Sequence, residues 1–206
     1  MIRPAALLAS ALLLAAPAVT AQQRTAPVIS QNPAAAVAGT YALDKSHASV
    51  VAKLSHMGLS NYTLRFNRLD GELQYDPRNL TRSRVSFTVD PGSVDTGNEK
   101  FNTELSGAQF LNGPSGLARF VSTGLTATGP RTGRLTGNLT LNGVTRPQTF
   151  QVTFNGGGRN FSGKPSVGFS AEGAIKRSDY RVATRLPAAV VGDEVRLLIE
   201  AEFNQS

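Results

Sequence analysis

Few side chains of this sequence are candidates for catalysis, and the most suggestive group is Asp44, Ser46 and His47. Together these residues could supply a base and a hydroxyl. The only other histidine among the 206 residues is His56. It lies nine positions after His47, so on one continuous strand the two rings point to opposite faces. The two histidines are therefore poorly placed to share a metal ion or to form an acid–base pair.

Sequence motifs of common catalytic and cofactor sites are absent. There is no glycine-flanked nucleophilic serine, no His-Glu-x-x-His motif and no glycine-rich phosphate loop before a helix. Cysteine is absent, which excludes a thiol nucleophile, a thiolate metal site and a disulfide. We therefore predict that the chain is not an enzyme and holds neither a metal nor a cofactor. A histidine at a strand end usually makes a structural hydrogen bond, so we do not assign a catalytic role to either ring. We place His47 and His56 at a polar rim.

A second polar group lies in residues 175–181, Ile-Lys-Arg-Ser-Asp-Tyr-Arg. One interpretation is a turn with a surface ion pair, worth at most about 1 kcal/mol. The other is a rim that meets the polar headgroup of a ligand, with Arg177 and Asp179 as the contacting residues. We assign Lys176 and Arg181 to the surface and leave both interpretations open for the other two.

The formal net charge is +7, and arginine outnumbers lysine. This charge is compatible with transient contact with a membrane surface that carries anionic headgroups, and equally with an ordinary solvated surface. Nucleic acid is not an expected partner. The basic residues are dispersed, tryptophan is absent, and the phenylalanines lie on the apolar side of predicted strands.

The secondary structure that carries these residues is predicted to be mainly β-strand. Residues 85–89 and 135–141 alternate apolar and polar side chains, which is the period of a strand with one buried face. A series of such strands closes into a barrel, and eight strands leave an interior that side chains fill or that holds one small ligand. We predict a mainly β fold, an eight-stranded antiparallel barrel. Its strands are expected at residues 47–55, 63–75, 83–90, 117–126, 133–142, 147–156, 166–175 and 194–204, with a lead-in at 40–44.

Local signals refine this plan. Asn142-Gly143 predicts a hairpin turn, and Gly129-Pro130 and residues 156–158 predict loops. Leu64 and Phe66 have the opposite parity to Leu69 and Leu73, so we predict a bulge or bend near Asn67-Arg68.

One segment departs from the β pattern. Thr96 and Glu99 form a capping box that predicts a short helix over 97–106, and Gly107 is expected to end it in the left-handed conformation. Phe101 and Leu105 then pack against the barrel and cover one end. Closing that end against water and gating a ligand are both open interpretations.

The inward face of the strands and helix supplies a candidate cavity lining. Its predicted members are Val50, Leu54, Phe66, Phe87, Phe101, Leu105, Phe120, Leu139, Leu141, Val152, Phe154, Phe169 and Ile175. Sequence alone does not separate a packed barrel from a hollow one, although the Val, Ala and Gly content of the inner face favours room inside.

The N-terminal residues indicate export. Residues 1–21 combine Arg3, an apolar stretch too short to span a bilayer and a small-residue cleavage site, so we predict a signal peptide. Residues 22–38 are predicted to be a flexible leader, and residues 39–206 the barrel domain. The mature chain is expected to be soluble and periplasmic.

Short motifs follow one another along the chain from about Thr40 to the end. They are Tyr41-Ala42-Leu43-Asp44, residues 46–50, residues 56–60, residues 66–71, residues 93–98, residues 120–123, residues 137–147 and residues 176–180. In this order, the motifs resemble those of the YceI-like family of exported, lipocalin-like barrels.

The resemblance implies a lipocalin-like barrel with a helical insertion and a long apolar cavity that binds a polyisoprenoid or similar amphiphilic lipid. A polyisoprenoid or an isoprenoid quinone is then the expected bound molecule, and a homodimer is an expected assembly. We interpret the chain as a periplasmic lipid carrier.

Three alternatives stay open: a stress or redox accessory protein acting through its surface, an enzyme acting on a lipid, and an outer-membrane barrel. The last would need aromatic girdles, yet the chain has no tryptophan and four tyrosines.

Overall fold

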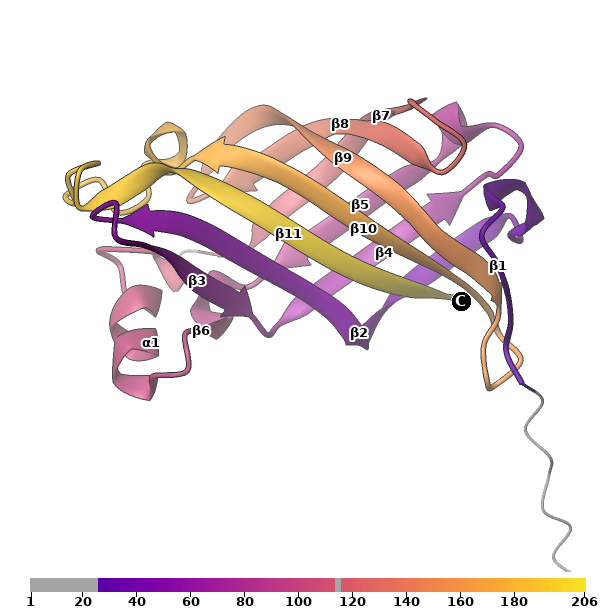
Figure 1. The fold of residues 1–206 in the computed structure, drawn as a ribbon, viewed down its shortest axis with the longest axis horizontal. Helices are drawn as coiled ribbons and strands as arrows, with labels where there is room; N and C mark the ends of the chain where they lie inside the picture. The colour runs from indigo at the N-terminus through magenta and orange to yellow at the C-terminus, as the bar shows by residue number, and fades with distance from the viewer. Residues whose placement is uncertain (1–25, 114–115) are drawn as a thin grey trace, which may run out of the picture.

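The computed structural model describes residues 26–113 and 116–206, so the predicted signal peptide lies outside the described residues. The described part is an antiparallel β-barrel with one α-helix (Figure 1). The barrel wall is built from β2 (Gly39–His56), β3 (Ser60–Phe66), β4 (Leu69–Tyr75), β5 (Arg84–Val89), β7 (Ala118–Ala127), β8 (Thr132–Leu141), β9 (Val144–Arg159), β10 (Pro165–Lys176) and β11 (Val191–Gln205).

The sheet closes because the last strand pairs with the first long one. Neighbours around the wall run β2, β4, β5, β7, β8, β9, β10 and β11, and β11 returns to β2 through pairs such as Ile199 with Val50. β3 continues the wall position of β4, because β2 pairs with β4 through its first half and with β3 through its second. The prediction of a closed eight-stranded barrel is confirmed.

The predicted bend near Asn67-Arg68 is where β3 ends and β4 begins. Both backbone N–H groups there donate to the Ser93 hydroxyl oxygen, at 3.1 and 2.9 Å. Phe66 and Leu69 on either side are both buried. The two unpaired residues therefore let side chains of opposite parity enter the same core.

The Asn142-Gly143 turn is also as predicted, with φ values of 49° and 73° that suit a tight hairpin. Residues 156–158 are not a loop but part of β9, and they carry strands on both sides. β10 pairs with them on one side, and β1 (Val28–Ser30) pairs with them on the other. A Cβ atom on Gly158 would collide with the Val28 carbonyl oxygen, so glycine is what allows β1 to approach.

The described end of the predicted flexible leader is therefore packed onto the barrel. After β1 comes a short 3-10 helix, η1 (Pro33–Ala35), and Ala36 is buried. The Tyr41 hydroxyl donates to the Val37 carbonyl oxygen at 2.6 Å. Figure 1 shows β1 and the C-terminus at the end of the barrel opposite the helix.

The helix, α1 (Glu99–Ser106), lies beside β3 and the short strand β6 (Val94–Asp95) (Figure 1). Its cap differs from the prediction. Asn98, not Thr96, accepts the Phe101 N–H, because the Thr96 hydroxyl and N–H both donate to the Asn102 side chain at 2.8 Å. Gly107 ends the helix in an extended conformation, with φ −69°, rather than a left-handed one.

Candidate functional site

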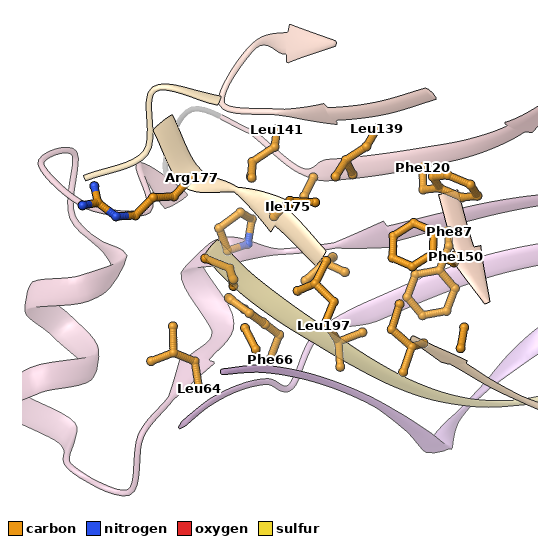
Figure 2. A pocket seen from close by; sticks show the side chains of 18 of the residues that line it. Leu64, Phe66, Phe87, Phe120, Leu139, Leu141, Phe150, Ile175, Arg177 and Leu197 are labelled. Carbon is orange, nitrogen blue, oxygen red and sulfur yellow. The ribbon is translucent and has the colours of Figure 1, made fainter. Parts of the chain in front are cut away.

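The barrel encloses an apolar cavity of about 910 Å³. All the barrel strands contribute to its lining, as do α1 and the segment 182–191. Figure 2 shows Phe87, Phe120 and Phe150 at one side and Arg177 at the other. Phe66, Leu139, Leu141, Ile175 and Leu197 lie between them. Apart from two tyrosines, the polar residues of the lining are few: Ser55, His56, Ser60, Ser83, Arg84 and Arg177. The wall therefore suits a largely hydrocarbon ligand with few polar contacts.

Twelve of the thirteen predicted apolar lining residues lie on the cavity wall, and Phe154 does not. Phe154 is 4% exposed and stacks on Tyr75, with ring centroids 6.3 Å apart and nearly parallel planes. It also contacts the Phe169 ring at 5.5 Å, which places it among the aromatic side chains that close the far end of the barrel. Its predicted place in the lining is wrong because the close packing of this end buries it behind Tyr75 and Phe169.

Sequence reasoning missed several lining residues. Val195, Leu197, Ile199 and Phe203 line the cavity from β11, and their alternation was a usable signal. The segment after η5 (Arg177–Tyr180) contributes Val182, Ala183 and Leu186. The sequence of this segment has no strand or helix periodicity that would predict which side chains point inward.

The four predicted rim residues separate in the structure. His56 and Arg177 belong to the cavity lining, whereas His47 and Asp179 do not. The His47 side chain is 64% exposed on the outside of the barrel, where its Nδ1 lies 3.0 Å from Asp44 Oδ2. The Asp44 carboxylate raises the pKa of His47, and His47 lowers that of Asp44 in return. The Asp179 main-chain carbonyl oxygen accepts a hydrogen bond from Arg146 Nε at 2.9 Å.

Arg177 is the most constrained polar side chain of the site, since it is 5% exposed. Its guanidinium donates five hydrogen bonds, all to main-chain carbonyl oxygens, at 2.6 to 3.3 Å. The acceptors belong to Val182, Ala183, Leu186, Val191 and Gly192. A guanidinium has five N–H donors, so none is left for a ligand. Arg177 holds the segment 182–192 in place as one wall of the cavity.

Two glycines leave room for aromatic rings at the cavity wall. A Cβ atom on Gly173 would lie 2.6 Å from the Phe150 ring, and a side chain on Gly137 would collide with the Phe120 ring. The two rings meet edge to face at 5.2 Å. Because these inner-face positions lack side chains, the rings lie against the wall instead of filling the interior.

The end beside α1 is lined by Phe101, Leu105, His56 and Val190. Phe101 packs edge to face on Tyr62 at 5.5 Å, so the helix is fixed to the wall as expected. The turn between β2 and β3 is tied to the start of the neighbouring strand β11, because the Met57 N–H donates to the Val190 carbonyl oxygen at 2.9 Å.

The opposite end is blocked by packed rings. Tyr75, Phe169 and Phe203 form its floor, with centroids of successive rings 6.0 and 6.4 Å apart. The Tyr75 hydroxyl points toward the leader, where the Pro33 carbonyl oxygen lies 3.4 Å away. Burial raises the pKa of Tyr75 to about 12.

Comparison with known proteins identifies the family to which this barrel belongs. The family model described as YceI-like domain matches residues 41–203, which is most of the described chain. The chain belongs to the YceI-like family. Among curated relatives, the UPF0312 protein of Ectopseudomonas mendocina is 38% identical over 168 residues, covering 80% of this chain and 88% of the relative. Protein YceI of Salmonella arizonae is 38% identical over 170 residues, covering 81% and 87%.

Solved structures share the YceI-like fold. BcnA of Burkholderia cenocepacia superimposes with a TM-score of 0.71 at 23% identity, over 78% of this chain and 98% of BcnA. The Campylobacter jejuni YceI protein gives 0.67 at 27% identity, over 74% and 90%. A polyisoprenoid binding domain from Saccharophagus degradans, implicated in plant cell wall breakdown, gives 0.61 at 18% identity, over 81% and 98%. None of the helices in the described part is both long and apolar enough to cross a bilayer.

Proposed function

We propose that this YceI-like protein binds a polyisoprenoid or a similar amphiphilic lipid in the barrel cavity and carries it through the periplasm. The observation that carries the proposal is the apolar cavity of about 910 Å³. Such a volume lies in the upper part of the range typical of small-molecule sites, about 300–1,000 Å³. The polyisoprenoid-binding domain of S. degradans supports the ligand class, because it has the same fold.

The physical chemistry of the wall favours a long chain over a compact polar ligand. Each CH₂ group transferred from water to the cavity contributes about 0.8 kcal/mol. A tail that extends from α1 to the floor at Tyr75 and Phe203 would gain this free energy along its whole length. The headgroup would lie at the α1 end, where His56, Ser55 and Ser60 are the polar lining residues.

The polar side chains of the cavity lining support ligand binding rather than catalysis. Arg177 commits its donors to the main chain, and His56 has no carboxylate among its hydrogen-bond partners in residues 26–113 and 116–206. Periplasmic carriage rests on the predicted signal peptide. Membrane-surface contact through basic residues, and a homodimer, stay predictions.

The test is native mass spectrometry of the mature protein from its own periplasm, followed by organic extraction. We expect a bound species of lipid mass that extracts as an isoprenoid. In a parallel sample, Ala171→Phe places a ring inside the cavity, since Ala171 lies on its wall. This variant is expected to lose the bound lipid.

The matched control is Ala174→Phe on the same strand, β10. Ala174 is exposed on the outer face, so the same ring is added without entering the cavity, and the lipid should be retained. A wild-type protein that is empty and takes up no added isoprenoid would contradict the proposal. Equal loss of lipid from both variants would also count against a cavity site.

A further inference from the structure

We propose that Asp44, His47 and Glu202 form a binding site for a divalent transition-metal ion, with Zn²⁺ as the probe, on the outer wall of the barrel. One ligand atom from each residue lies within 4.8 Å of the others. The site is separate from the apolar cavity, whose lining includes none of the three residues. It therefore does not rest on the proposed lipid function.

The site is created by an irregularity in the pairing of β2 with β11. Leu43 pairs with Phe203 and Ala48 with Ala201, so four residues of β2 face the single residue Glu202. On a regular strand, Asp44 and His47 would point to opposite faces because they are three positions apart. The bulged segment turns both side chains to the outside, beside Glu202.

One ligand is held in place and two can adjust. Asp44 is the most buried of the three, and its carboxylate accepts hydrogen bonds from the Asn204 side chain and the Ser46 N–H, each at 3.0 Å. Asp44 Oδ2 and His47 Nδ1 are already 3.0 Å apart. Glu202 is exposed, so its side chain is free to close the remaining separation. A fixed carboxylate supported by second-layer hydrogen bonds is the usual arrangement around a bound metal.

The donor set suits zinc. Zn²⁺ binds histidine nitrogen and carboxylate oxygen at about 2.0–2.2 Å, and three protein ligands leave one position for water. A small hollow of about 110 Å³ beside the ligands is lined by His47, Glu202, Glu200 and Asn155 among others. Two carboxylates and one imidazole also give the site a net negative charge when His47 is neutral, which favours a divalent cation over an anion.

The alternative to a metal site is that the Asp44–His47 hydrogen bond only stabilises the bulged segment of β2. A structural brace predicts a change in stability on mutation but no stoichiometric metal uptake. Measuring both the zinc affinity and the folding stability of the same variants therefore distinguishes a metal site from a purely structural hydrogen bond.

The experiment is a Zn²⁺ titration of the mature, untagged protein in competition with a chromophoric chelator. We expect one Zn²⁺ per chain, and at least a tenfold loss of affinity in His47→Gln and in Glu202→Gln. The matched control is His56→Gln, which removes the only other histidine of a chain without cysteine, and should leave zinc affinity unchanged. Circular dichroism establishes that each variant is folded.

A direct readout does not depend on the variants. In the ¹⁵N-labelled protein, zinc should shift the ring nitrogen signals of His47 and leave those of His56 in place. Absence of stoichiometric zinc binding to the wild type would overturn the proposal. So would a folded His47→Gln protein that binds zinc as tightly as the wild type, or a zinc-induced shift confined to His56.

Discussion

At the residue scale, the central polar fact is a buried arginine with no carboxylate among its hydrogen-bond partners in the described chain. The Arg177 guanidinium donates hydrogen bonds to five main-chain carbonyl oxygens, which are spread along the segment 182–192 from one end to the other. This network replaces regular secondary structure, because η5 and β11 are separated by a stretch without strand pairing. A single side chain therefore shapes a wall of the site.

Replacing Arg177 with Met should destabilise the protein by at least about 3 kcal/mol, because several carbonyl oxygens lose their donor at once. Urea unfolding measures the loss, and hydrogen exchange should show faster exchange in residues 182–192. Arg185→Met is the control, since Arg185 is exposed on the same segment and its loss should change stability by no more than about 0.5 kcal/mol. Equal stability of the two variants would contradict the role given to Arg177.

The raised pKa of Tyr75 makes alkaline stability a second residue-scale test. Burial moves its pKa from 10.0 to about 12, so folding favours the neutral phenol. The unfolded chain loses this proton near pH 10 and the folded chain near pH 12, so stability falls between those values. This shift corresponds to roughly 3 kcal/mol once Tyr75 is ionised in both the folded and the unfolded chain.

Unfolding free energies at pH 9 and pH 11.5 test this. The wild type should lose roughly 2 kcal/mol more across this interval than Tyr75→Phe, whose ring keeps the packing and removes the proton. The variant still contains Tyr41, whose pKa is also raised by burial, so some alkaline loss remains. Identical losses in the two proteins would show that Tyr75 ionises equally in both states.

At the element scale, glycines decide which strands can approach one another. Gly157 and Gly158 in β9 admit β1 and the buried Ala36, so the leader becomes part of the closed end. A Cβ atom on Gly157 would lie 2.9 Å from Ala36 Cβ and 3.0 Å from the Phe154 ring. Any side chain at residue 157 would therefore clash with Ala36 of the leader and with the Phe154 ring.

Gly157→Val should consequently destabilise the protein by about 1–3 kcal/mol and release residues 28–38 from the barrel. Limited proteolysis should cut the variant before Gly39 faster than the wild type. Gly168→Val on the neighbouring strand is the control, because the nearest atom to its added Cβ is 3.9 Å away. Unchanged stability and cleavage in Gly157→Val would show that the leader does not depend on this contact.

At the scale of the whole molecule, the barrel has an interior that is partly empty. An apolar cavity of about 910 Å³ leaves the lining side chains without packing partners on one side. A bound lipid would supply these contacts, so occupancy and stability are linked.

The delipidated protein should therefore melt at a higher temperature when an isoprenoid alcohol is added. At a ligand concentration 100 times Kd, the stabilisation is about 2.7 kcal/mol, or roughly 5–10 °C for a chain of this size. Differential scanning fluorimetry with alcohols of increasing chain length measures it. Ala171→Phe should show no shift, and an equal shift in that variant would place the ligand elsewhere.

Alternation and turn residues predicted the strands, the Asn142-Gly143 turn, the bend at residues 67–68 and most of the inward-facing residues. These features depend on alternation and backbone preferences, which act over a few neighbouring residues. Family membership followed from the same motifs in order.

The folded structure was needed to show that the barrel is hollow, that Phe154 packs against Tyr75 and Phe169, and that the cavity lining lacks His47 and Asp179. It also decided that the leader packs on β9, that Arg177 binds carbonyl oxygens, and that Glu202 lies beside Asp44. Each of these outcomes depends on the register between strands far apart in the chain, where one extra residue moves a side chain to the other face. No local pattern carries that information.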